Sequence, residues 1–176
     1  MEKTNANIFK IAVVGAESTG KTTLCRELAE HYNDLWLPEY ARTYVENLGH
    51  PYNWEDVIHI AEEQCRLEKE YEKKAKKMLF LDTDLIITKV WFQHVWKSCP
   101  DWIDKEIKES ERLVYLLCDT DLEWEYDPVR ENPDIRNYLT EMYKNIIVTN
   151  KFPYFVVSGF GKNRTNNAVK IIDVLI

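Results

Sequence analysis

The sequence has no excess of positive charge and no long apolar run. Its 176 residues include 23 Lys and Arg against 30 Asp and Glu, which gives a formal net charge of −7 at pH 7. Proteins that coat nucleic acid need a basic surplus, so we expect no nucleic-acid partner. No apolar run approaches the roughly 20 residues that cross a bilayer, and no secretory leader precedes the first apolar segment. We therefore expect a cytoplasmic protein with no membrane partner.

The cysteines also form no recognisable motif. The four of them stand at positions 25, 65, 99 and 118 without a C-x-x-C pair, so neither a zinc site nor a disulfide framework is indicated, and reduced thiols are expected. Internal repeats, low-complexity segments and inter-domain linkers are absent, and nothing indicates the oligomeric state. At this length we expect one domain spanning residues 1–176.

One short motif carries most of the functional information. Residues 15–22 follow the phosphate-binding loop pattern G-x-x-x-x-G-K-[ST], reading Gly15, Ala16, Glu17, Ser18, Thr19, Gly20, Lys21 and Thr22. The glycines permit backbone angles that a Cβ would forbid, so the loop can turn its N–H groups toward phosphate oxygens. Lys21 would add a positive charge at the outer phosphates of ATP, and the Thr22 hydroxyl would bind Mg²⁺.

The surroundings of this motif decide between a functional loop and an ordinary strand-to-helix turn with the same letters. An apolar run at 8–14 predicts a buried strand before it, and 23–32 predicts a helix after it. The N-terminus of that helix, which begins at Thr23, would point its positive end at the bound anion. Strand, loop and helix therefore stand in the order that phosphate binding requires.

The remaining chain predicts alternating strands and helices. Further strands are expected at 34–37, 78–81, 112–118 and 154–158, and helices at 39–45, 54–77, 85–96, 101–109, 134–150 and 165–176. Thr165 is a plausible N-cap for the last helix. This alternation predicts an α/β fold of the P-loop NTPase type, with a five-stranded parallel sheet and helices on both faces.

Polar residues follow the second and third strands, where ligands bind in open α/β sheets. Glu39 and Arg42 share one helical face and are expected near the substrate, the alternative being a capping Glu and a solvated Arg. Asp82 is favoured as the carboxylate that faces Mg²⁺ opposite Thr22. Asp84 is left as either a helix cap or a substrate contact.

Two later loops complete the predicted site. Residues 119–136 lack helical periodicity and are interpreted as a flap, on which Arg130 or Arg136 could stabilise transferring charge and Trp124 could stack on a flat ring. The alternative is a solvated loop with its Trp tucked into the core. The loop 159–164, with Gly161, is placed to wrap the nucleotide base.

Taken together, these motifs resemble a known family. The combination of the phosphate loop with P-E-Y-A-R at 38–42, F-L-D-T-D at 80–84 and L-E-W at 122–124 resembles the ribosylnicotinamide kinase domain of bacterial NadR-type proteins, within the P-loop ATPase/kinase group. The resemblance extends from residue 8 to the last helix. It implies that residues 15–23 hold ATP, that Glu39 and Arg42 lie near the nucleoside, and that Trp124 lies near the substrate ring.

The resemblance implies a small-molecule kinase, with Mg²⁺ and ATP, that phosphorylates the 5′-hydroxyl of a nucleoside such as nicotinamide riboside. Glu39 is the first choice for the carboxylate that orients this hydroxyl, and Asp84 the second. The best-known members carry an adenylyltransferase domain ahead of the kinase, so a free-standing kinase or a relative with another acceptor is implied. The alternative is a nucleotide-driven switch or regulatory ATPase. No N-K-x-D element is present to read guanine, which argues against a GTPase.

Overall fold

Five apolar runs form one parallel sheet. The computed structural model describes residues 7–111, 113–126 and 133–176. Its strands, in the spatial order β2-β3-β1-β4-β5, are β1 (Phe9–Val14), β2 (Leu35–Leu37), β3 (Met78–Asp82), β4 (Leu113–Cys118) and β5 (Tyr154–Val157). All four strand pairings are parallel. The carboxyl ends of the strands therefore lie along one edge of the sheet, where the predicted site residues gather.

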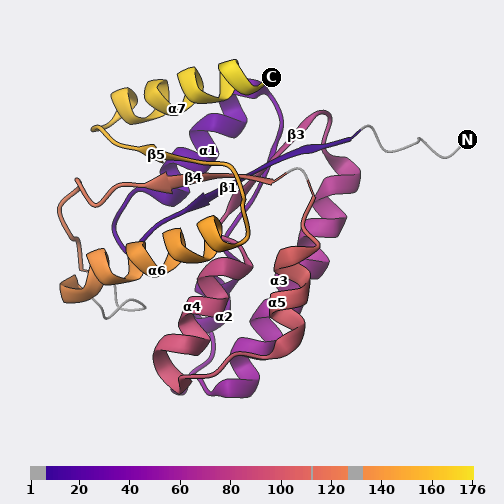
Figure 1. Cartoon of the computed structure of the whole chain (residues 1–176), viewed down its shortest axis with the longest axis vertical. Coiled ribbons are helices and arrows are strands. Elements are labelled where there is room, and N and C mark those ends of the chain that lie inside the picture. Colours follow the sequence, from indigo (N-terminus) through magenta and orange to yellow (C-terminus); the bar gives the residue numbers. More distant parts are fainter. Residues whose placement is uncertain (1–6, 112, 127–132) are drawn as a thin grey trace, which may run out of the picture.

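Helices cover both faces of this sheet (Figure 1). They are α1 (Lys21–Tyr32), α2 (Tyr40–Glu46), α3 (Trp54–Lys74), α4 (Leu85–Trp96), α5 (Asp101–Lys108), α6 (Arg136–Thr149) and α7 (Lys162–Leu175), with a 3-10 turn at Pro133–Ile135. Core side chains of α1 and α7 pack against one face, and those of α3, α4, α5 and α6 pack against the other. The predicted fold class is confirmed.

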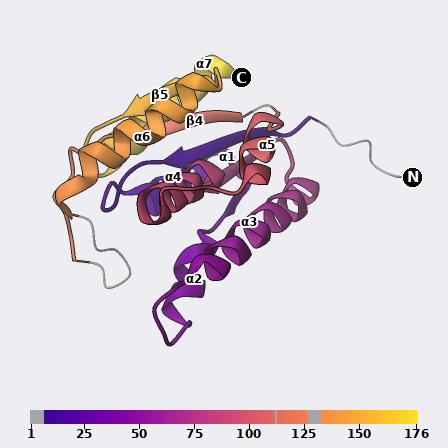
Figure 2. The same ribbon diagram turned by 60° about the horizontal axis from the view of Figure 1, so that its bottom comes forward.

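The strand sequences explain the two-sided packing. In β1, Ile11 and Val13 belong to the core under α1 and α7, whereas Ala12 and Val14 belong to the core on the opposite face. Because alternate residues of a strand point to opposite faces, a strand covered on both sides reads as a continuous apolar run. α2 has no buried residue and lies beside α3 at the edge of the molecule (Figure 2).

Some predicted boundaries were wrong. α3 ends at Lys74 instead of residue 77, because the backbone N–H groups of residues 76–78 bond to the Asp34 carboxylate and start the turn into β3. α7 begins at Lys162 with Gly161 at its N-cap. Thr165 is therefore inside the first turn, where its hydroxyl donates to the Glu27 carboxylate on α1, and it is not the cap. Within the described ranges, no helix is both long and apolar enough to span a bilayer.

Candidate active site

The loop between β1 and α1 has the backbone that phosphate binding needs. Gly15 has φ 155° and Gly20 has φ 74°, conformations that residues with a Cβ rarely adopt. A Cβ on Gly15 would lie 3.1 Å from both the Cβ and the carbonyl oxygen of Cys118, so the end of β4 would have to shift to admit one. Ser18, inside the loop, also has a positive φ of 53°. Such conformations cluster at ligand-binding turns because they aim the backbone at a target.

Side chains of the motif brace the loop from within. The Lys21 ammonium and the Thr19 hydroxyl both donate to the carbonyl oxygen of Ala16, each at 2.8 Å. Lys21 is only 6% exposed and Thr19 is fully buried. Gly20 is the N-cap of α1, and no side chain caps that helix end. An anion at this end would therefore meet backbone N–H groups and the helix dipole.

The two residues predicted to bind Mg²⁺ are in direct contact. The Thr22 hydroxyl donates to Oδ2 of Asp82 at 2.6 Å, which joins the first turn of α1 to the end of β3. Asp82 is 1% exposed. A hydroxyl and a carboxylate are the hard oxygen ligands that Mg²⁺ prefers when it arrives with a nucleotide. The residues at this position fit the expected ion.

Asp84 occupies a different environment from Asp82. It is the N-cap of α4, where one oxygen accepts from the backbone N–H of Ile86 at 3.0 Å and the other accepts from the Tyr115 hydroxyl. Burial raises the pKa of Asp84 to about 7, although both hydrogen bonds favour the ionised form. Asp84 does not line the cavity described next. Of the two alternatives for Asp84, this geometry agrees with the helix cap.

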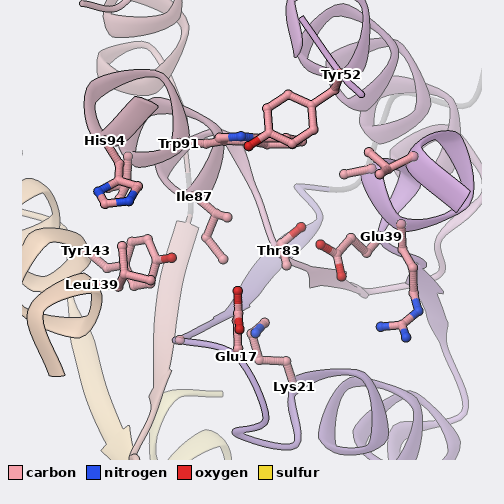
Figure 3. A pocket seen from close by; sticks show the side chains of 15 residues that line it. Glu17, Lys21, Glu39, Tyr52, Thr83, Ile87, Trp91, His94, Leu139 and Tyr143 are labelled. Atoms are coloured by element: carbon pink, nitrogen blue, oxygen red, sulfur yellow. The ribbon is translucent and has the colours of Figure 1, made fainter. Parts of the chain in front are cut away.

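A cavity of about 150 Å³ opens beside the phosphate loop. Figure 3 shows Lys21 and Glu17 at one end of it and Trp91 with Tyr52 at the opposite end. The ring of Tyr52 meets that of Trp91 edge-on, with centroids 4.8 Å apart. The remaining wall comes from the segments that follow β1, β2 and β3 and from the helices α2, α4 and α6. Its residues are Gly15, Glu39, Ala41, Arg42, Val45, Thr83, Ile87, Val90, His94, Leu139 and Tyr143. The cavity is thus polar near the loop and mostly apolar or aromatic away from it.

Glu39 and Arg42, the pair predicted after the second strand, line this cavity. Glu39 is at the N-cap position of α2 without capping the helix, and Arg42 follows one turn later. Nε of Arg42 lies 3.2 Å from a carboxylate oxygen of Glu46. The structure therefore brings Glu39, Arg42, Glu17 and Lys21 to one cavity.

The described part of the predicted flap touches the phosphate loop. The Ser18 hydroxyl donates to the Glu125 carbonyl at 3.1 Å, and the Glu125 N–H donates to the Ser18 oxygen at 3.2 Å. Arg136 donates to the Leu122 carbonyl at 2.8 Å and to the Ser18 carbonyl at 3.3 Å. Arg136, the first residue of α6, thus lies against the loop, and its role toward a transferring phosphate stays a prediction. Arg130, the other candidate, lies outside the described residues.

Trp124, Thr23 and Gly161 are among the predicted residues that lie outside the cavity wall. Trp124 is half-buried, and its ring meets that of Tyr126 edge-on at 6.2 Å. Thr23 is exposed on the first turn of α1, and Gly161 is exposed at the N-cap of α7. Their roles toward a nucleotide or a substrate remain predictions.

Sequence reasoning missed several residues that the structure places at the site, His94 and Arg164 among them. His94 was assigned no role, yet it belongs to the cavity wall. Arg164 falls in the segment 159–164, which was interpreted as a loop, yet it is 4% exposed and its guanidinium bonds to the phosphate loop. The apolar pattern around position 94 signals only a helix, and nothing marks Arg164 as buried.

The sequence of this chain is similar to those of known proteins. A family profile described as "AAA domain" matches residues 10–164. The chain belongs to this AAA domain family. Among curated relatives of the domain is the trifunctional NAD biosynthesis/regulator protein NadR of Escherichia coli K12, 28% identical over 142 residues. That match covers 75% of this chain and 35% of NadR, so the chain spans about a third of that relative's length.

Solved structures share the fold of this AAA domain. A NadR protein in complex with NR has a TM-score of 0.76 at 21% identity, and the match covers 94% of this chain and 48% of the other. A deoxyadenosine kinase from M. mycoides, with dCMP among its bound products, has a TM-score of 0.66 at 14% identity over 94% of this chain and all of the kinase. The resemblance to NadR-type proteins is confirmed, and nucleoside kinases share the P-loop architecture.

Proposed function

We propose that this chain is an ATP-dependent kinase that phosphorylates the 5′-hydroxyl of a nucleoside, with nicotinamide riboside as the acceptor. The observation that carries the proposal is that Lys21 of the phosphate loop and Glu39, which follows β2, line the same cavity. A donor phosphate held at Lys21 and an acceptor held at Glu39 would meet in it. The matches to NadR, at 28% identity, support the choice of acceptor.

In this proposal the phosphate loop binds ATP through its backbone N–H groups and the N-terminus of α1, and Lys21 neutralises charge on the transferring phosphoryl group. Its bond to the Ala16 carbonyl would be exchanged for bonds to phosphate oxygens. Thr22 and Asp82 would hold Mg²⁺, which would supply positive charge beside the phosphates of ATP. These residues need no rearrangement of the sheet to do so.

The acceptor would enter from the apolar end of the cavity. Trp91 and Tyr52 offer an aromatic surface for a planar ring, while the ribosyl group points toward the phosphate loop. Glu39 would orient the 5′-hydroxyl and accept its proton as the new O–P bond forms and the bond to ADP breaks. Glu39 is favoured over Asp84 because only Glu39 lines the cavity.

The proposal is tested by ADP formation from ATP and Mg²⁺ with and without a nucleoside. Strong stimulation by nicotinamide riboside is expected, and a panel of other ribosides and deoxyribosides would rank the acceptors. Equal stimulation by thymidine or deoxyadenosine would reassign the acceptor within the same reaction. Slow ATP hydrolysis at a rate that no nucleoside changes would instead favour a regulatory ATPase. The relative NadR is described as a regulator as well as a biosynthetic protein, which supports testing this alternative.

A further inference from the structure

A buried arginine links three loops at the edge of the sheet where the cavity lies. Arg164, on the first turn of α7, uses all four terminal N–H donors of its guanidinium. One nitrogen donates to the Asp121 carboxylate at 2.6 Å and to the Gly159 carbonyl at 2.9 Å. The other donates to the carbonyl oxygens of Thr19 at 3.0 Å and Asp119 at 2.9 Å.

The acceptors belong to segments far apart in the sequence. Thr19 is in the phosphate loop, Asp119 and Asp121 follow β4, and Gly159 follows β5. Asp121 also accepts from the backbone N–H of Gly159 at 2.6 Å, so its carboxylate joins the last two segments and balances the buried charge. A guanidinium is the side chain that can satisfy four acceptors in one plane, whereas a lysine ammonium has three donors on a single point.

The bond to Thr19 has a direct geometric consequence for phosphate binding. In a trans peptide, the carbonyl oxygen of one residue and the N–H of the next point in opposite directions. The described residues contain no cis peptide. Holding the Thr19 oxygen toward Arg164 on α7 therefore turns the Gly20 N–H away from that side chain. This N–H is one of the donors that the phosphate-loop motif presents to a phosphate group.

We propose that Arg164, held by Asp121, is a positioning residue that fixes the Thr19–Gly20 peptide for binding the phosphates of ATP. The inference rests on the proposed nucleotide-binding role of the loop. Arg164 does not touch the cavity, so it acts through the loop backbone and not on the acceptor. Without it, the peptide could rotate and the loop would have to be ordered by the ligand, which weakens binding.

The test compares Arg164→Lys with Arg66→Lys, an exposed arginine on α3 that is paired with Glu63 and Glu70. Affinity for the non-hydrolysable analogue AMP-PNP is measured by calorimetry, with the melting temperature recorded for each protein. We expect Arg164→Lys to weaken AMP-PNP binding at least tenfold, while the KM for the nucleoside changes less than twofold. Arg66→Lys should alter neither. A folded Arg164→Lys protein that binds AMP-PNP like the wild type would overturn the proposal, even if its melting temperature falls.

Two further measurements keep the test decisive. Guanidinium at low millimolar concentration should restore part of the AMP-PNP affinity of Arg164→Ala and leave Arg66→Ala unchanged; no restoration in a folded Arg164→Ala protein would count against positioning. If neither Arg164 variant folds, Asp121→Asn decides, because it keeps the shape and removes the charge that holds Arg164. Its AMP-PNP affinity should fall at least threefold, and an unchanged value overturns the inference. AMP-PNP binding needs no acceptor, so wild-type protein that binds it without phosphorylating nucleosides would contradict only the proposed function.

Discussion

Thr22 and Asp82 are 60 residues apart in the sequence, yet the hydroxyl of one donates to the carboxylate of the other at 2.6 Å. The bond joins the start of α1 to the end of β3, which are brought together because β3 pairs directly with β1. The register places Val13 opposite Asp82, and the Val13 carbonyl accepts from the Thr83 N–H at 3.1 Å. The pairing of two strands thus sets the position of both proposed Mg²⁺ ligands.

The role of Asp82 is tested by Asp82→Asn, which keeps the shape and an acceptor for the Thr22 hydroxyl but removes the negative charge. We expect the Mg²⁺ concentration for half-maximal turnover to rise by about 10- to 100-fold. Titration of turnover with Mg²⁺ at saturating ATP measures this shift. An unchanged Mg²⁺ requirement would show that Asp82 does not face the metal.

Lys21→Ala removes the charge at the transferring phosphate. Turnover should fall by at least about 100-fold, as for other preorganised groups that stabilise a transition state. The circular dichroism spectrum should be unchanged, because the bond of Lys21 to the Ala16 carbonyl lies within the loop and joins no two secondary-structure elements. A Lys21→Ala protein with near wild-type turnover would refute the assignment of the site.

Glu39→Gln removes the proposed proton acceptor and preserves the volume of the side chain. We expect kcat to fall by about 100-fold, the lower range for general-base catalysis, with the KM for ATP unchanged. Steady-state kinetics at saturating nucleoside separates the two parameters. Asp84→Asn serves as the comparison, since a helix cap should affect stability more than kcat, and the reverse result would transfer the role to Asp84.

Trp91→Ala tests the aromatic end of the cavity. Loss of a stacking surface should raise the KM for the nucleoside about tenfold and leave the KM for ATP unaltered. Trp91→Phe should recover much of the loss, because a smaller ring still offers a face. Equal effects on both substrates would place the acceptor elsewhere.

The hydrogen bonds of Asp34 predict how the stability of the fold depends on pH. Burial alone would raise the pKa of Asp34, but the backbone N–H groups of residues 76, 78, 77 and 35 donate to its carboxylate and hold its pKa below the usual value. A depressed pKa in the folded state stabilises the protein above the unfolded value of about 3.9, and this contribution is lost as the pH falls through the folded pKa.

Asp34→Asn should therefore destabilise the fold by about 2 kcal/mol at pH 7. The difference from wild type should shrink as the pH falls below 4. Urea unfolding at a series of pH values measures both quantities. A difference that does not depend on pH would mean that the charge of Asp34 contributes nothing beyond its shape.

The sequence was sufficient for features that depend on local pattern. The phosphate loop, the order of strands and helices, and Asp82 at the end of a buried strand all follow from spacing and apolar periodicity. The mutual placement of Glu39 and Lys21 also followed, because the carboxyl ends of parallel strands share one edge. These features depend either on residues that are neighbours in the sequence or on a general rule of α/β folds.

Contacts between a side chain and the backbone, and the packing of distant helices, could not be predicted from the sequence. Arg164 bonds chiefly to carbonyl oxygens, which every residue has, so no partner residue type in the sequence signals its contacts. Asp34 likewise binds backbone N–H groups, and for that reason the end of α3 was placed three residues late. Cavity walls such as His94 depend on how α4 and α6 pack, which periodicity alone does not determine.

The central claim is that phosphate passes from ATP to a ribosyl hydroxyl in the cavity between Lys21 and Glu39. The most direct measurement follows the label of [γ-³²P]ATP in the presence of Mg²⁺ and nicotinamide riboside, with the product identified by mass and by its ³¹P signal. The account predicts label in a 5′-phosphomonoester of the nucleoside, with one ADP formed per product. Label appearing only as inorganic phosphate, at a rate indifferent to the nucleoside, would contradict it.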